Sequence, residues 1–126
     1  MITEELLGGQ NSIAYSASDL VLTNVTLNGS QNLVKVYKPS NLLYIFFDFT
    51  LGTIESNGWY NLIEFPEIVD VPYYSPLVFT YPTLAGGCTN RLGRILPSAS
   101  TSNFGFYCYT SDSNKRFEFG FTCMAR

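Results

Sequence analysis

Apolar and polar residues alternate along short segments of this chain, and the alternation constrains the fold more than any other feature. Segment 43–51 places Leu, Ile, Phe, Phe and Leu at its odd positions and mixes Tyr, Phe, Asp and Thr at its even ones. Side chains of a β-strand point to opposite faces in turn, so one face of this segment is apolar. Segments 104–110 and 117–123 repeat the pattern, with Phe and Cys sharing one face. Each segment predicts a half-buried antiparallel strand.

Clusters of Gly, Pro, Asn and Ser interrupt these segments every 8–12 residues, a spacing typical of sandwiches and barrels. Asn28-Gly29 and Asn57-Gly58 are turn dipeptides, because Asn and Gly tolerate positive φ. The remaining predicted strands are 20–27, 33–38, 59–65, 77–81 and 90–96. Only TEELL, near the start, resembles a helical turn. At 126 residues the chain fits one domain. We predict an all-β fold, an antiparallel β-sandwich of jelly-roll-like type with little or no helix.

The polar stretch SDSN at 111–114 predicts a hairpin between 104–110 and 117–123. Its simplest register pairs Cys108 with Phe117 and Phe106 with Phe119. Cys123 then lies about 20 Å from Cys108 along the strand. A disulfide needs Cα atoms within about 7 Å, so we predict no Cys108–Cys123 bond. Prolines crowd 66–82, and because proline cannot donate to a ladder, we expect 66–76 to be irregular.

Composition argues against several function classes. The chain has no histidine, the commonest general base and metal ligand, and its net charge is −3 with no basic cluster. Nucleic-acid binding requires concentrated positive charge, and a bilayer span requires about 20 apolar residues in a row. We predict no nucleic-acid partner, no membrane insertion, no cofactor and no metal. The start has no signal-peptide pattern, so we expect either synthesis and assembly in a cytoplasm or a fragment.

Nothing in the sequence predicts catalysis. No spacing among the candidate carboxylates matches the pair that a glycosidase needs; these are Asp48, Glu55, Glu64 and Glu67. A Cys or Ser nucleophile would lack its usual histidine base. Three cysteines without a CxxC motif leave one unpaired, so we interpret them as reduced, half-buried thiols. We predict that the protein is not an enzyme.

Binding is the remaining function class. Aromatic residues make up 16% of the chain and charged residues only 13%, which indicates either a tightly packed core or a surface for a ligand or a partner. Rings with polar tips cover the apolar faces of sugars. Such rings are Trp59, Tyr60, Tyr73, Tyr74, Tyr81, Tyr107 and Tyr109. Arg91 and Arg94 could clamp a carboxylate or phosphate. The candidate ligand-binding residues are Trp59, Tyr60, Tyr73, Tyr74, Arg91 and Asp112. For each of them, core or interface packing is the alternative.

The order of features from about residue 33 to the end is also informative. An aromatic strand is followed by Gly58-Trp59, by Phe65-Pro66 with Pro72 and Pro76, and then by the segments FGFYCYT and FEFGFTCM. This order resembles the C-terminal receptor-binding heads of tail-fibre and baseplate proteins of tailed phages and prophages. The resemblance covers about three quarters of the chain and concerns order and spacing rather than an invariant motif. The three cysteines depart from the pattern.

The resemblance implies a single β-sandwich head over residues 20–126, with 1–19 as an N-terminal segment at a stem or shoulder junction. It implies a homotrimer that binds a bacterial cell-surface saccharide without cleaving it and contacts other tail or baseplate proteins. Its localisation would be the virion, after assembly in the bacterial host cytoplasm. In such heads the tryptophan mostly packs, which favours a structural Trp59, although Trp59 stays among the candidates. The rival interpretation is a structural virion or appendage subunit whose aromatics pack against neighbouring chains.

Overall fold

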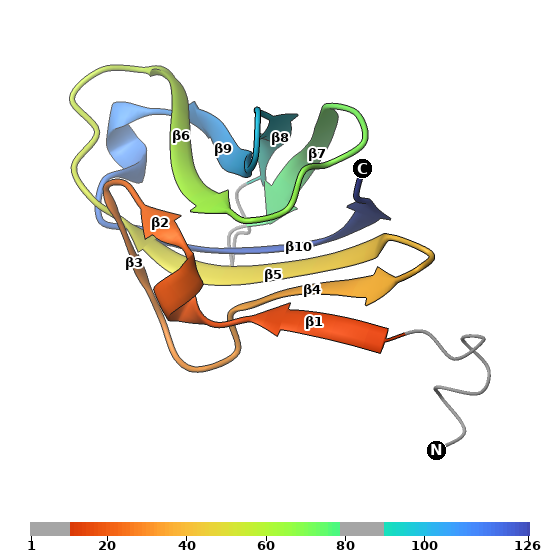
Figure 1. Cartoon of the computed structure of the whole chain (residues 1–126). Coiled ribbons are helices and arrows are strands. Elements are labelled where there is room, and N and C mark those ends of the chain that lie inside the picture. Colours follow the sequence, from red (N-terminus) through yellow and green to blue (C-terminus); the bar gives the residue numbers. More distant parts are fainter. Residues whose placement is uncertain (1–10, 79–89) are drawn as a thin grey trace.

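A computed structural model describes residues 11–78 and 90–126, which form two antiparallel five-stranded sheets packed face to face (Figure 1). The first sheet contains β1 (Asn11–Tyr15), β3 (Val25–Leu27), β4 (Leu33–Lys38), β5 (Leu42–Leu51) and β10 (Arg116–Met124). The second contains β2 (Val21–Leu22), β6 (Gly58–Phe65), β7 (Tyr73–Val78), β8 (Asn90–Pro97) and β9 (Ser102–Cys108). The described helices are two 3₁₀ turns, Ala17–Asp19 and Thr110–Asp112. The predicted all-β sandwich is confirmed.

The core between the sheets combines aliphatic side chains with a cluster of phenylalanines. The odd positions of β5 are buried, as the alternation predicts, and so are Phe104 and Phe106 of β9. Phe104 stacks on Phe119 of the other sheet with ring centroids 4.5 Å apart, and Phe106 meets Phe117 at 5.0 Å. Full burial of one such side chain contributes about 1.5–3 kcal/mol, so this cluster is a main source of stability.

The predicted hairpin between 104–110 and 117–123 is wrong. β9 pairs with β6 and β8 in the second sheet, whereas β10 pairs with β5 in the first. The stretch between them crosses from one sheet to the other. The expected partners Phe106–Phe119 and Cys108–Phe117 are therefore not ladder pairs. Alternation tells which side chains point into the core, but it does not tell whether two such faces lie side by side or opposite each other.

The absence of a Cys108–Cys123 disulfide is confirmed, since both cysteines are free and buried. They lie in different sheets, in β9 and β10. Burial raises the pKa of Cys108 to about 12 and that of Cys123 to about 11. Both thiols therefore stay protonated and act as small apolar side chains. Cys88 lies outside the described residues.

The predicted strand 20–27 is two strands that belong to different sheets. β2 pairs with β6, and β3 pairs with β5. Between them Asn24 has φ of 57°, a left-handed conformation that Asn tolerates better than most residues. Its side chain donates to the carbonyl of Thr53 and occupies the space where a Cβ on Gly52 would lie. The chain therefore changes sheets at Asn24.

The expectation of an irregular connection over 66–76 is wrong at its end, because β7 begins at Tyr73 and includes Pro76. β7 pairs along its length with β8, and among the described residues its other edge pairs with β10 at Val78 alone, so a missing donor at Pro76 is tolerated there. The predicted strand 77–81 is therefore wrong at its start by four residues, and the remaining predicted strands appear within two residues of their expected bounds. The TEELL turn and residues 79–81 lie outside the described residues. Residues 11–15, placed in the N-terminal segment, form β1 on the edge of β4.

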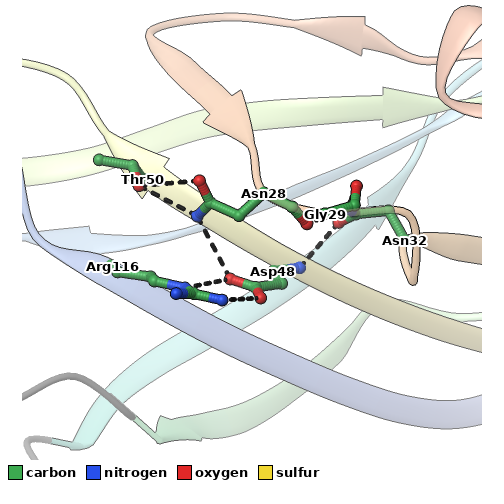
Figure 2. A network of polar contacts seen from close by, with 6 residues as sticks. All are labelled: Asn28, Gly29, Asn32, Asp48, Thr50 and Arg116. Carbon is green, nitrogen blue, oxygen red and sulfur yellow. Dashed lines mark hydrogen bonds and ion pairs between the residues drawn. The ribbon is translucent and has the colours of Figure 1, made fainter.

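A closed polar network lies on the outer face of the first sheet (Figure 2). Asp48 of β5 receives two hydrogen bonds from Arg116 of β10, from Nε at 2.8 Å and from Nη2 at 2.5 Å. Asn28 donates to Asp48 and Thr50, and the amide oxygen of Asn32 accepts from the Asp48 backbone N–H. The Arg116 hydrogen bonds lower the pKa of Asp48. This network fastens the 28–32 turn, with Gly29 at φ 65°, onto the sheet.

Candidate functional site

The outer face of the second sheet carries an aromatic cluster that starts at β6. Trp59 points outward and remains 39% exposed, whereas Tyr60, its neighbour, packs against the core. Trp59 pairs in register with Tyr107 of β9, and their rings meet edge to face at 5.7 Å. The ring of Tyr74 of β7, which is 58% exposed, also lies edge to face with the indole, with centroids 6.5 Å apart. Three strands, β6, β7 and β9, therefore bring these rings together.

β8 supplies the charged side chain under this cluster. Arg94 lies in a row of paired residues that runs across the sheet. In this row Arg94 lies between Tyr74 of β7 and Gly105 of β9, and Gly105 pairs in turn with Asn61 of β6. The Arg94 guanidinium carbon lies 4.6 Å from the centre of the Trp59 ring, a cation–π arrangement. A side chain at Gly105 would collide with the β6 backbone beside the register shift at Asn61. A glycine is thus required at this close approach of the β6 backbone to β9.

A hollow of about 320 Å³ opens beside Trp59. It is lined by Trp59, Asn90, Arg91, Leu92, Tyr107 and Tyr109. Tyr107 and Tyr109 meet edge to face at 5.3 Å and form one wall. Small-molecule sites are typically about 300–1,000 Å³ and combine apolar walls with a few polar groups, so this hollow suits a small ligand or one end of a longer one. We call the hollow, with Tyr74 and Arg94 at its rim, the aromatic face.

A buried ion pair fixes the floor of the hollow. Arg91 donates from Nε and Nη2 to the two carboxylate oxygens of Asp112, at 2.8 and 2.6 Å, and Asp112 is fully buried. Donating hydrogen bonds to Asp112 raises the pKa of Arg91, so the arginine stays charged. Asp112 also accepts from the backbone N–H of Tyr109, and the Tyr109 ring lies 4.7 Å from the guanidinium of Arg91. The pair therefore holds Tyr109 in place.

The six candidate residues have different positions in the structure. Trp59 and Arg91 line the hollow, and Tyr74 contacts Trp59 at its rim. Asp112 lies beneath and positions Arg91 and Tyr109. The other two point to the inside of the sandwich. The Tyr60 hydroxyl donates to the carbonyl of Ser56, and Tyr73 packs against Phe121 with centroids 5.6 Å apart. Tyr81 lies outside the described residues.

The candidate set omitted four residues of the hollow: Asn90, Leu92, Tyr107 and Tyr109. A local signal existed for Tyr107, because it alternates with the inward-facing Phe104 and Phe106 and must therefore face outward. No local signal placed it beside Trp59, because that requires the pairing of β6 with β9. Leu92 is 50% exposed, and its position opposite the rings depends equally on the pairing of β8 with its neighbours.

The carboxylates considered for catalysis do not line the hollow. Asp48 belongs to the network on the opposite sheet. Glu64 accepts a hydrogen bond from the hydroxyl of Thr101 at 2.5 Å, and Glu67 accepts one from Tyr15 at 2.6 Å. Burial together with Glu67 raises the pKa of Tyr15 to about 12. Within residues 11–78 and 90–126, no three Cys, Asp or Glu side chains gather closely enough to hold a metal ion.

The chain was compared with protein-family models, curated proteins and solved structures, and nothing in these three comparisons matches it. None of the helices in the described part of the chain is long and apolar enough to cross a membrane.

Proposed function

We propose that this protein is a non-catalytic carbohydrate-binding head and that the aromatic face is its ligand site. The single observation that carries the proposal is the hollow of about 320 Å³ with Trp59, Tyr107 and Tyr109 as walls and Asn90 beside them. Flat rings cover the apolar face of a sugar, and an amide satisfies its hydroxyls. The floor is preorganised by the Arg91–Asp112 pair, so binding requires little reordering.

The resemblance to receptor-binding heads of tailed phages defines the proposed setting. There the ligand is a saccharide of the bacterial surface, the head works as a homotrimer in the virion, and other tail or baseplate proteins hold it. A shallow, open site binds weakly on its own. Three linked copies raise the effective concentration at a cell surface, so weak sites suffice for adhesion.

Glycan-array and whole-cell binding by the full chain tests this proposal. Trp59→Ala should weaken binding at least about fivefold, because it removes the ring that forms one wall. Tyr44→Ala is the matched control, since Tyr44 is 45% exposed on the other sheet. We expect the control to bind like the wild type. A folded chain that binds no saccharide and no bacterial envelope would refute the proposal.

A second candidate function, a structural subunit, is favoured by a different region. The outer face of the first sheet carries a hollow of about 270 Å³ lined by Gln31, Leu33, Tyr44 and Phe46. Exposed Met124 belongs to the same sheet. Partly exposed apolar side chains of this kind suit packing against a neighbouring chain. The native mass of wild type and Tyr44→Ala distinguishes the candidates: loss of assembly in the variant supports subunit packing, and an unchanged assembly argues against it.

A further inference from the structure

Three arginines of the described residues differ in how the protein neutralises them. Arg91 and Arg116 each form a bidentate ion pair, with Asp112 and Asp48 respectively. Arg94 forms no ion pair with any carboxylate of residues 11–78 and 90–126. Its one hydrogen bond to a described residue runs from Nη2 to the amide oxygen of Asn61, at 3.2 Å. Its Nε–H is covered and meets no acceptor there.

Arg94 is nevertheless held in a defined orientation. Its guanidinium lies against the Trp59 ring, and Asn61 fixes one end of it. A long exposed side chain ordinarily loses rotamer entropy when it binds a ligand, and an arginine already stacked on an indole loses less. Glu64, the acidic residue of β6, accepts from Thr101 instead. The aromatic face thus presents an ordered positive charge beside the ring that forms a wall of the hollow.

From this arrangement we infer that the ligand is an acidic saccharide, one that bears a carboxylate or a phosphate. The inference rests on the proposed function and specifies its ligand class. The sugar ring lies against Trp59 and Tyr107, and the anionic group accepts hydrogen bonds from the free Nη donors of Arg94. Guanidinium groups recognise planar carboxylates and phosphates through such paired donors. Arg91 does not serve this purpose, because Asp112 already takes its Nε and Nη2 donors.

The test compares acidic saccharides with neutral ones of the same skeleton. An array of uronate, sialate and phosphate-bearing oligosaccharides is presented beside their methyl-esterified or unsubstituted counterparts, and the full chain is titrated against each pair. We expect the acidic member to bind about tenfold more tightly. Its binding should weaken from 50 to 500 mM salt as screening increases, whereas binding of the neutral member should not.

Two substitutions attribute the preference to Arg94. Arg94→Gln removes the charge, and Asn61→Asp keeps the shape but places a carboxylate where the amide oxygen now accepts from Nη2. Both should reduce the acidic preference to about twofold or less. Lys35→Gln removes a charge from the first sheet and should leave the preference unchanged.

The outcomes separate the inference from the proposed function. Equal binding of acidic and neutral members, or a preference that survives both Arg94→Gln and Asn61→Asp, overturns the acidic ligand class while saccharide binding stands. Binding of neither class, or binding that Trp59→Ala leaves intact, overturns the proposed function itself. Circular dichroism and urea unfolding establish that each variant is folded before it is titrated.

Discussion

The outer faces of the two sheets each present an arginine, and they use it differently. On the first sheet, Arg116 donates two hydrogen bonds to the Asp48 carboxylate (Figure 2). In the 28–32 turn, Asn28 donates to the same carboxylate, and Asn32 accepts from the Asp48 backbone N–H. On the second sheet, Arg94 lies on Trp59 without a carboxylate partner among the described residues. The donors of Arg116 are thus used within the protein, whereas we propose that those of Arg94 are available to a ligand. Their substitutions should therefore affect different properties.

The largest change in stability is expected on the first sheet, where Arg116 pairs with Asp48. Asp48→Ala leaves the Arg116 guanidinium and the Asn28 amide without their acceptor, and should lower the free energy of unfolding by about 2 kcal/mol. This expected loss is smaller than that for breaking a fully buried ion pair, because the Arg116 side chain is 35% exposed and water solvates it. Urea unfolding measures the change.

Glu118→Ala is the matched control, because Glu118 lies opposite Asp48 on β10. Two like charges facing each other across a ladder do not stabilise it, so this variant should change stability by no more than about 0.5 kcal/mol. Equal losses in the two variants would mean that the Asp48 network contributes nothing specific.

The same network predicts how stability depends on pH. The pKa of Asp48 is lowered in the folded state, chiefly by its hydrogen bonds from Arg116, relative to about 3.9 when unfolded. The stabilisation it gives is therefore complete above the unfolded pKa and is lost as pH falls through the folded pKa. The difference in unfolding free energy between wild type and Asp48→Asn should be constant above about pH 5 and shrink below about pH 4. A difference that stays constant down to pH 2.5 would contradict the assignment.

A smaller change in stability is expected on the second sheet, at the aromatic face. Trp59→Ala should cost about 1 kcal/mol or less, because the ring is 39% exposed and packs against neighbours rather than in the core. Its loss of saccharide binding should exceed what this destabilisation explains. A loss of several kcal/mol in urea unfolding would instead identify Trp59 as a structural residue, the role that the resemblance to phage heads favours.

The smallest effect is expected when Arg94 is given a carboxylate partner. Asn61→Asp should create an exposed ion pair with Arg94 and raise the free energy of unfolding by about 0.2–1 kcal/mol. The gain should diminish in 0.5 M salt, because exposed pairs are screened. Destabilisation by this variant would indicate that Asn61 is held by contacts that a carboxylate cannot make.

The two faces also differ in how much of their structure can be predicted from the sequence. Alternation in β5, β9 and β10 correctly predicted the row of side chains that faces the core, because the inward or outward position depends on neighbouring residues alone. It did not predict that Asp48, on the opposite face, is buried or that Phe121 is only half-buried. The proposed hairpin of 104–110 with 117–123 was wrong, because a core-facing strand pairs equally well within a sheet or packs across the core.

The candidate site was predicted in part for the same reason. Trp59, Tyr74 and Arg91 were identified from residue type, and the structure brings them to one end of one sheet. Tyr60 and Tyr73 were chosen by the same criterion, yet they face inward because they stand next to outward-facing residues in their strands. Asp112, predicted to lie in a polar hairpin turn and to contact the ligand, is fully buried because it pairs with Arg91 from β8. Such partners are fixed by strand pairing over long sequence separations.

The most direct test of the account uses the only tryptophan of the chain, Trp59, as its own reporter. The tryptophan emission of the full chain is titrated with a saccharide that binds on the array, and affinity is measured in parallel by calorimetry. The account predicts a saturable change in emission with the same dissociation constant as the calorimetric one. Calorimetric binding that saturates while the emission of Trp59 stays constant would place the ligand elsewhere and contradict the account.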